Sequence, residues 1–391
     1  MKNSIDRNSI RQSIGEVFLE AANALETGVV GRKIRVGLTI LGSEHGPAEL
    51  IAGAELAQSG SADFEVVIIG SGVETTLEAV EAADEKDAHI KMDQLLEEGD
   101  IDAAVTMHYN FPIGVSTVGR VVTPARGKKM FIATTTGTSA TGRVEAMLRN
   151  AIFGIATAKA CGIPEPTVGI LNIDGARQVE RCLKELSEQG YPIHFAESRR
   201  NDAGVLMRGN DLLQGVPDVM VTDSLTGNVL MKVFSAFHSG GSYEAIGFGY
   251  GPGVGEDYDR VICIISRASG APVIAGAIRY ARECARGKLL DKARQEFVAV
   301  KKAGWDRVLG GLVKDSPKLH EEPEGVAAPP SKPVSAEIPG IDILQLEDAV
   351  NVLWSNNIYA SSGMGCTGPV ILVASEDKAN SVQLLKEAGY L

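Results

Sequence analysis

Four short loops carry residues whose types and spacing could do chemistry. They are Gly42–Pro47, Thr134–Arg143, Asp223–Asn228 and Ser361–Pro369. The first three follow apolar runs and lead into helix-like segments, where free backbone N–H groups point at an anion. The second also ends in an arginine, which can hold two oxygens at once. These loops therefore predict a site for phosphate or a similar anion.

The first two loops supply most of the candidate phosphate ligands. These are Gly42, Ser43, His45, Gly46, Thr136, Gly137, Thr138, Ser139 and Arg143. The first loop is equally typical of a tight strand-to-helix connection, with Pro47 in the first helical turn. The alternative for the second is a polar loop whose hydroxyls cap a helix.

The third loop adds Thr226, Gly227 and Asn228 to the candidates. Asn228 could hydrogen-bond a substrate carbonyl. An asparagine at the start of a helix is more often a capping residue, so both interpretations stay open.

The fourth loop contains Cys366 between Gly365 and Thr367, immediately before an apolar run. Its glycine neighbours would leave the sulfur accessible, and a thiolate is a strong nucleophile that can carry an acyl group as a thioester. We therefore expect Cys366 to be catalytic. Buried structural thiols are expected for the other four cysteines, which are Cys161, Cys182, Cys263 and Cys284.

Histidine spacing gives no metal signature, and no C-x-x-C pair is present, so we expect no metal and no disulfide framework. His108, which follows an apolar run, and His45 could act as bases or phosphate ligands. The glycines of residues 249–260 precede a strand rather than joining a strand to a helix, which excludes a dinucleotide-binding fingerprint. No cofactor is expected.

Short apolar runs alternate with helix-like segments along most of the chain. Strands are expected at 33–41, 64–70, 102–107, 129–135, 167–173, 218–223, 260–266 and 369–375, and helices at 47–59, 143–160, 176–189, 228–239 and 271–286. Apolar runs without strict alternation are typical of a parallel sheet that is buried on both faces. The pattern predicts an α/β fold with ligands at the carboxyl ends of its strands.

Composition narrows the class of protein. The 391 residues carry a net charge of −12 and only 5% are aromatic, which argues against a nucleic-acid binder. The first 28 residues lack the apolar core of a signal peptide, and no run is long enough for a transmembrane helix. Five cysteines without C-x-x-C spacing are typical of a reducing compartment, so a cytoplasmic location is expected.

We expect four regions along the chain. They are an N-terminal helical segment (1–30), a two-lobed α/β catalytic core (31–313), a Pro-rich linker (314–340) and a C-terminal segment that completes the core and carries Cys366 (341–391). The linker is expected because its residues are rich in Pro, Glu and Ser and offer little to bury.

Taken in order, several segments resemble the phosphate:acyl-acyl-carrier-protein acyltransferases of phospholipid synthesis. They are LGSEHGPAELIAGAELA (41–57), PTVGILNI (166–173), GNDLLQGVPDVMVTDSLTGNVLMK (209–232) and the tail 357–388. Only Asn228 carries over cleanly as a functional position. The family's Lys-Gly segment is missing, its LD-x-GAN motif is replaced by ATTTGTSATGR (133–143), and its tail has no cysteine at position 366.

The chain is more similar overall to the alpha subunits of component C of glycine/sarcosine/betaine reductase. The shared features are the Thr-rich loop, GYGPGVGEDYDR, the Pro-rich linker and the Gly-Met-Gly-Cys-Thr-Gly tail. The resemblance implies a three-layer αβα fold like that of phosphotransacetylases and isopropylmalate dehydrogenases, with two lobes and a cleft. It also implies formation of acetyl phosphate from phosphate and an acetyl thioester on Cys366, with Asn228 assisting. From its position after an apolar run, we expect His108 to be catalytic as well.

The same resemblance implies two partners, the component C beta subunit and the selenoprotein component A that delivers the acetyl group; a homodimer is compatible with it. Three alternatives stay open. The chain could use a long acyl chain on acyl-carrier protein, or act as a scaffold without catalysis. It could also be a coenzyme-A phosphotransacetylase, although nothing in the sequence indicates an adenine site.

Overall fold

The computed structural model describes residues 15, 18, 22, 32–200, 204–315, 327–341, 345–365 and 368–391. The helical segment expected at 1–30 lies almost entirely outside these residues. Within the described part of the chain, no helix is both long and apolar enough to span a membrane.

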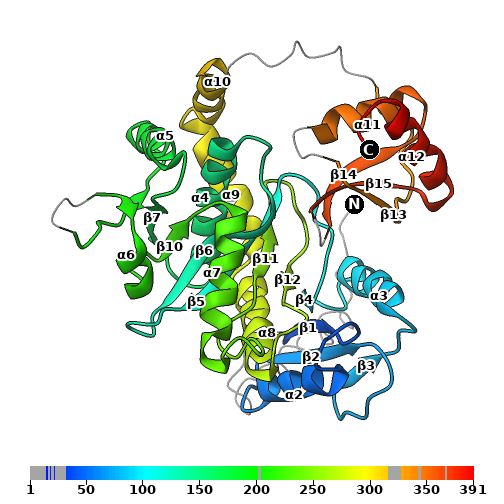
Figure 1. Ribbon diagram of the computed structural model, residues 1–391. Coiled ribbons are helices and arrows are strands. Elements are labelled where there is room, and N and C mark those ends of the chain that lie inside the picture. The colour runs from blue at the N-terminus through cyan, green and yellow to red at the C-terminus, as the bar shows by residue number, and fades with distance from the viewer. Residues whose placement is uncertain are drawn as a thin grey trace, which may run out of the picture.

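A twelve-stranded sheet forms the centre of the molecule (Figure 1). One half is parallel and contains β1 (Ile34–Thr39), β2 (Phe64–Ile69), β3 (Glu78–Val80), β4 (Ala103–Thr106) and β12 (Ile262–Ile264). The other half, also parallel, contains β6 (Lys129–Thr138), β7 (Thr167–Leu171), β8 (His194–Phe195), β9 (Leu206–Met207) and β10 (Val219–Val221). The strands expected at 33–41, 64–70, 102–107, 129–135, 167–173, 218–223 and 260–266 are confirmed, whereas the sequence did not predict the short strands β3, β8 and β9.

Two strands that the sequence did not predict join the halves. β5 (Val115–Val122) and β11 (Gly251–Val254) run antiparallel to each other and to their outer neighbours. The two halves therefore run in opposite directions rather than forming one continuous parallel sheet. β11 lies in the glycine-rich stretch of residues 249–260, where the sequence predicted no strand. Its Gly251 has φ +88°, and a Cβ there would be 1.7 Å from the Val118 carbonyl oxygen, so the close strand contact requires glycine.

Helices cover both faces of the sheet, which confirms the α/β class. On one face pack α2 (Pro47–Gln58), α4 (Arg143–Ala160), α5 (Ala176–Glu188), α8 (Ala271–Arg286) and α9 (Leu289–Lys302), followed by α10 (Trp305–Asp315). On the other pack α3 (Glu85–Glu98), α6 (Gly209–Gln214) and α7 (Ser224–Ala236), which a 3₁₀ turn, η1 (Phe237–Ser239), extends. Each face has its own apolar core, as a three-layer αβα arrangement requires.

The C-terminal residues build a separate small sheet. β15 (Gly368–Val373), expected at 369–375 in the main sheet, pairs instead with β13 (Ala336–Pro339) and β14 (Ala360–Gly365). α11 (Leu346–Ser355) and α12 (Lys378–Glu387), which the 3₁₀ turn η3 (Ser375–Asp377) precedes, complete an independent core around Leu346, Leu353, Ile371 and Leu385. An apolar run indicates burial but not the partner strand, and β13 falls within the expected linker.

This small sheet contacts the main body beside the end of β4. Gly363 pairs with Pro112 in an antiparallel bridge, and the Asn110 side chain donates a hydrogen bond to the Glu337 carboxylate. Ile113 packs against the small core. The β14 strand therefore lies next to the segment that follows β4.

Helix α7 packs unusually close to β6. A Cβ placed on Gly227 would lie 1.7 Å from the carbonyl oxygen of Thr134. Any larger residue must push the helix away from the sheet, because packed interiors have little free space. Gly227 is therefore a packing residue, whatever its neighbours bind.

We expect Gly227→Ala to lower the free energy of unfolding by about 1–3 kcal/mol, the usual cost of overpacking. Gly310→Ala is the matched control, because Gly310 is exposed in α10 and a Cβ there meets nothing within 4 Å. The control should be up to about 1 kcal/mol more stable than wild type, since alanine favours helix. Urea denaturation followed by circular dichroism measures both; equal midpoints for the two variants would contradict the packing role.

Candidate functional site

A cavity of about 350 Å³ is lined by residues from both halves of the sheet. Met107–Tyr109 and Phe111 follow β4, Ser266 and Arg267 follow β12, and Thr136 and Gly137 lie near the end of β6. Asn228 and Lys232 enter from α7. Four of the predicted site residues therefore meet here: His108, Thr136, Gly137 and Asn228.

Asn228 does not cap α7. The helix begins at Ser224, and Asp223 is its cap, accepting a 2.8 Å hydrogen bond from the Thr226 backbone N–H. Asn228 lies one turn inside the helix, where its Nδ2 donates to the Thr135 carbonyl oxygen at 3.1 Å. This bond holds the Asn228 side chain at the cavity wall, with one amide hydrogen already used.

Two cations line the cavity that the sequence did not single out. Lys232 lies one turn beyond Asn228 on α7, and Arg267 follows β12 in the opposite half of the sheet. Arg267 forms a 2.8 Å ion pair with Glu85, and both side chains are partly exposed. The four-residue spacing of Asn228 and Lys232 could have pointed to Lys232, because such residues share a helix face.

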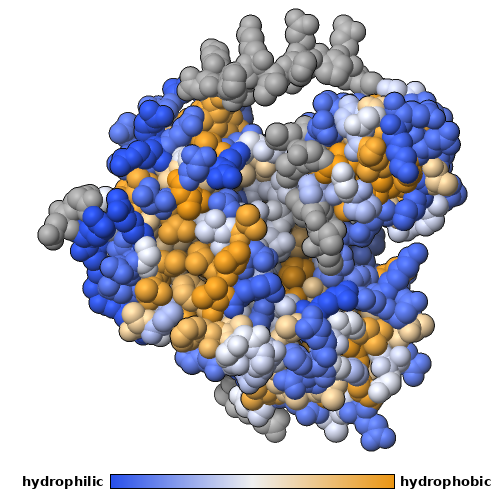
Figure 2. All heavy atoms as spheres, viewed as in Figure 1, coloured by the Kyte–Doolittle hydropathy of each residue, from blue (hydrophilic) through white to orange (hydrophobic). Residues whose placement is uncertain are grey.

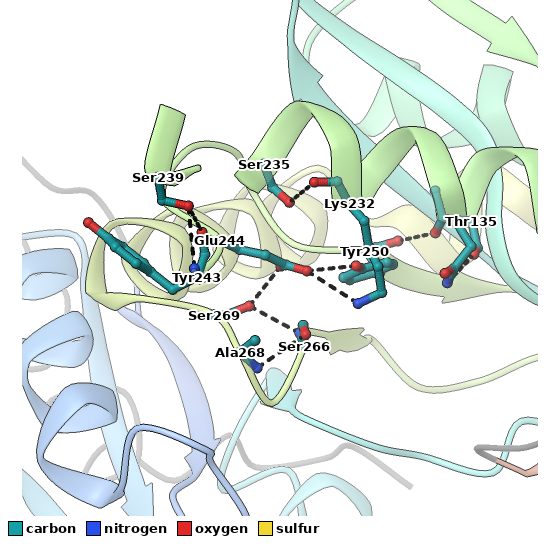
Figure 3. A network of polar contacts seen from close by, with 11 residues as sticks. Thr135, Lys232, Ser235, Ser239, Tyr243, Glu244, Tyr250, Ser266, Ala268 and Ser269 are labelled. Atoms are coloured by element: carbon teal, nitrogen blue, oxygen red, sulfur yellow. Dashed lines mark hydrogen bonds and ion pairs between the residues drawn. The ribbon is translucent and has the colours of Figure 1, made fainter. Parts of the chain in front are cut away.

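The buried carboxylate of Glu244 lies beside the Lys232 ammonium (Figure 3). Glu244 accepts hydrogen bonds from the Tyr250 hydroxyl at 2.8 Å and the Ser269 hydroxyl at 3.0 Å. The Lys232 ammonium lies 3.6 Å from the same carboxylate and over the Tyr250 ring. A buried charge needs such partners. The two hydroxyls therefore hold the carboxylate of Glu244 in place beside the Lys232 ammonium.

The next link in the network ties Tyr250 to β6 (Figure 3). The Thr135 hydroxyl donates to the Tyr250 carbonyl oxygen at 2.7 Å. It also forms a hydrogen bond with the Thr117 hydroxyl. Because Thr135 also accepts from Asn228, one β6 residue positions both walls of the cavity.

His108 lies between this cavity and a second one of about 510 Å³ beside the small C-terminal sheet. Burial lowers the pKa of His108, so the ring is neutral near pH 7. Its neighbour His89, whose pKa burial also lowers, contacts the Thr106 hydroxyl at 3.0 Å. A neutral imidazole at the cavity wall can accept a proton.

The Thr-rich loop lines a third cavity of about 470 Å³, together with the start of α7. Gly137, Thr138, Ser139, Arg143 and Thr226 meet there. Two of their hydroxyls already have structural partners. Ser139 bonds the Ser116 hydroxyl and the Asn150 amide oxygen, and Thr226 bonds the Asp223 carboxylate.

Arg143, at the first position of α4, forms a long 3.8 Å ion pair with the exposed Asp174. It is thus the strongest anion-binding candidate in this third cavity. The phosphate residues predicted in the Thr-rich loop are divided between two cavities that share Gly137.

In the first loop, Gly42–Pro47, three backbone N–H groups already have hydrogen-bond acceptors within the protein. The Glu44 N–H donates to the Arg267 carbonyl oxygen, the His45 N–H to the Ser43 hydroxyl, and the Gly46 N–H to the Ser43 carbonyl oxygen. Only Glu44 of this loop lines the 350 Å³ cavity. Gly42, Ser43, His45 and Gly46 border neither this cavity nor the one at the Thr-rich loop, and the tight-turn interpretation fits them better.

Cys366 and Thr367 lie outside the described residues, and Gly365 is the last residue of β14. Among the other cysteines, Cys263 and Cys284 are fully buried, and burial raises their pKa values, as expected of inert thiols. Cys161 and Cys182 are half-buried. The described residues contain no cluster suited to a metal ion.

Two substitutions of Glu244 separate the loss of its hydrogen-bond acceptor from the loss of its charge. We expect Glu244→Ala to lower the free energy of unfolding by about 1–3 kcal/mol, because two buried hydroxyls lose their acceptor. Glu244→Gln keeps the size and an acceptor oxygen and should cost less. Urea titration of both variants measures the difference. A Glu244→Ala protein as stable as wild type would show that the hydroxyls do not depend on this carboxylate.

Known proteins place the chain in a family. Residues 34–372 match the family model described as "Fatty acid synthesis protein". The chain is 58% identical over 382 residues to the glycine/sarcosine/betaine reductase complex component C subunit alpha of Peptoclostridium acidaminophilum, covering 98% of this chain and 99% of that one. It is 26% identical to a phosphate acyltransferase of Geobacillus sp. (strain WCH70) over 236 residues, 51% of this chain and 70% of that one.

Among solved structures, the EutD phosphotransacetylase from Staphylococcus aureus aligns with 69% of this chain and 98% of its own, at 11% identity and a TM-score of 0.43. The resemblance noted from the sequence motifs is confirmed by the sequence comparisons. The chain belongs to the fatty acid synthesis protein family and, within it, to the family of glycine/sarcosine/betaine reductase complex component C alpha subunits.

Proposed function

We propose that this chain transfers an acetyl group from a thioester to inorganic phosphate, forming acetyl phosphate within a glycine/sarcosine/betaine reductase complex. Family membership supports the reductase assignment, and the names of the more distant relatives support transfer of acyl groups to phosphate. The component C beta subunit and the selenoprotein component A, which would deliver the acetyl group, are the partners that this role requires.

The observation that carries the proposal is the pair of cations in the 350 Å³ cavity. Lys232 and Arg267 come from opposite halves of the sheet and line one cavity with Asn228 and His108. The chain as a whole has a net charge of −12, so its general field repels phosphate. Local cations are what an anion site in such a protein needs.

The size of the cavity favours a short acyl group. Ligand cavities usually hold roughly 300–1,000 Å³, and this one, at about 350 Å³, is near the lower limit. Phosphate and a two-carbon acyl group suit that volume. The alternative donor, a long acyl chain on acyl-carrier protein, would need more room, and a comparison of acetyl and long-chain donors distinguishes the two.

In the proposed reaction, Cys366 carries the acetyl group as a thioester. A phosphate oxygen attacks the carbonyl carbon, the new C–O bond forms, and the C–S bond breaks to release acetyl phosphate and the Cys366 thiolate. Asn228 donates to the oxyanion that develops on the carbonyl. Neutral His108 accepts the proton that the attacking phosphate loses, and returns it to the thiolate.

The position of β14 supports a thioester on Cys366 that reacts at the 350 Å³ cavity. Gly363, three residues before Cys366, pairs with Pro112, which directly follows the cavity residue Phe111. In the Thr-rich cavity, Thr138 and Arg143 would attract phosphate near its entry, beside Gly137, which borders both cavities.

We expect Lys232→Gln to raise the KM for phosphate roughly ten- to a hundredfold, because a hydrogen bond to a charged group contributes about 1.5–3 kcal/mol. The rate of arsenate- or phosphate-dependent acetyl transfer measures it. Lys302→Gln, at the exposed end of α9, is the control for loss of one positive charge. An unchanged KM in Lys232→Gln would remove this lysine from the phosphate site.

Replacing the proposed nucleophile tests the covalent step. Acetyl phosphate should acetylate Cys366 in the reverse direction, and arsenate should then release acetate from the thioester. We expect Cys366→Ala to abolish arsenate-dependent breakdown of acetyl phosphate and the acetyl adduct seen by mass spectrometry.

Cys182→Ala is the matched control for this test, because burial raises the pKa of that thiol and it lines none of the three cavities. It should keep both signals. Phosphate binding, measured by calorimetry, should persist in both variants. Full activity of Cys366→Ala would discard the thioester on this residue.

A further inference from the structure

A cavity of about 160 Å³ shares no lining residue with the three cavities described above. Its wall includes Asn172, which follows β7, and Arg208, which follows β9, and these two parallel strands are paired. Arg177 enters from the first turn of α5. Figure 2 shows a hydrophilic surface over the positions that α5 and α6 occupy in Figure 1. The cavity therefore lies at the carboxyl ends of strands, where open α/β sheets bind ligands.

Positive charge predominates around this cavity. Arg177, Arg200 and Arg208 line it, against a single carboxylate, that of Glu180. This carboxylate accepts a 2.8 Å hydrogen bond from the Lys184 ammonium, so its charge is already paired. Like charges around one hollow repel each other, and an anion bound between them removes that repulsion.

Two of the three arginines are available to a ligand. Arg177 and Arg208 form no ion pair with any residue in the part of the chain that the structure describes. Carboxylates are not lacking nearby, since Glu185 of the same helix pairs with Arg307 at 2.9 Å. The guanidinium groups at the cavity therefore keep N–H donors for an anion, and each can hold two oxygens at once.

A buried carboxylate, that of Asp211, fixes the chain around the cavity. Asp211 is 2% exposed and accepts hydrogen bonds from the Ser198 hydroxyl at 2.9 Å, the Arg199 N–H at 3.1 Å and the Arg208 N–H at 3.0 Å. Burial opposes the charged form, but these hydrogen bonds outweigh it and lower the pKa of Asp211. The segment that leads to Arg200 and the backbone of Arg208 are thus held together before any ligand binds.

We propose that this cavity is a second anion site, which binds a compact oxyanion of the phosphate type. Its volume of about 160 Å³ is well below the roughly 300–1,000 Å³ of most ligand cavities, so it suits one small group rather than a nucleotide. Asn172 adds a side-chain amide to the arginine donors. An acidic protein would need a continuous basic surface, whereas Asp174 and Glu197 are exposed beside the cavity.

The site lies beside the Thr-rich cavity without belonging to it. Asp174, between Asn172 and Arg177 in the sequence, forms the 3.8 Å ion pair with Arg143 of that cavity. The strands β6, β7, β9 and β10 are parallel, so the two cavities follow one another along the same edge of the sheet. Binding of an anion to the 160 Å³ cavity requires no turnover and is measured on the resting protein.

Labelling of the full-length chain with phenylglyoxal, which modifies arginine side chains, tests the site directly by mass spectrometry. We expect saturating inorganic phosphate to slow the labelling of Arg177 and Arg208 by about tenfold, because the bound anion occupies their N–H groups. Arg181 is the matched control, since it is exposed on α5 and lines none of the four cavities. Its labelling should not change, and chloride at equal ionic strength should protect none of the three.

Calorimetry with inorganic phosphate distinguishes this site from the one in the proposed function. One binding event should persist in Lys232→Gln. Adding Arg177→Gln and Arg208→Gln should weaken that event at least about tenfold, because each loses a hydrogen bond to a charged group, whereas adding Arg181→Gln should leave it unchanged. Circular dichroism should show that all variants are folded.

Loss of all phosphate binding in Lys232→Gln, together with labelling of Arg177 and Arg208 that phosphate does not slow, would overturn the second site and leave the proposed function intact. A single wild-type event that depends on Arg177 and Arg208 alone would support the second site and count against phosphate at Lys232. Protection of the two arginines by polyglutamate but not by phosphate would overturn the proposal in favour of an acidic protein partner.

Discussion

The contact between α7 and β6 determines the geometry of everything around it. Gly227 allows the helix to approach the Thr134 carbonyl oxygen so closely that a Cβ would not fit. One residue later, Asn228 hydrogen-bonds the next carbonyl, that of Thr135. Steric contact sets the height of the helix above the sheet, and the amide sets its rotation. The positions of Asn228 and Lys232 both follow from these two adjacent contacts.

Two carboxylates fix where the positive charges lie at the 350 Å³ cavity. Glu244 is almost fully buried, yet its carboxylate has two hydroxyl donors and the Lys232 ammonium nearby. The lysine side chain, more than half exposed, therefore has a fixed anion at one side and the open cavity at the other. Arg267 is held similarly by Glu85, from the other half of the sheet. An acidic chain thus presents two positive groups at one place without a general basic surface.

Local sequence patterns predicted the elements better than their partners. Apolar runs and flanking glycines located β1, β2, β6 and α4 closely, because these signals depend on neighbouring residues. The same patterns could not show that β15 joins a separate sheet, or that a glycine-rich stretch forms β11, since strand pairing depends on distant residues. Among the residues that line the 350 Å³ cavity, His108 was singled out by its position after an apolar run, and Asn228 by its loop together with the family resemblance. Lys232 and Glu244 were missed because a lone lysine and a lone glutamate carry no motif, and only the fold brings them together.

The two faces of α7 connect the cavity to the outer surface. Side chains at 227, 228 and 231 serve the sheet and the cavity, whereas those at 225, 229 and 233 point outward. Because a helix moves as a rigid body, its contacts with β6 at Gly227 and Asn228 fix Asn228 and Lys232 together. Free movement of α7 would misalign the two cavity walls, so these two contacts are what keep Asn228 and Lys232 facing the residues that follow β4 and β12.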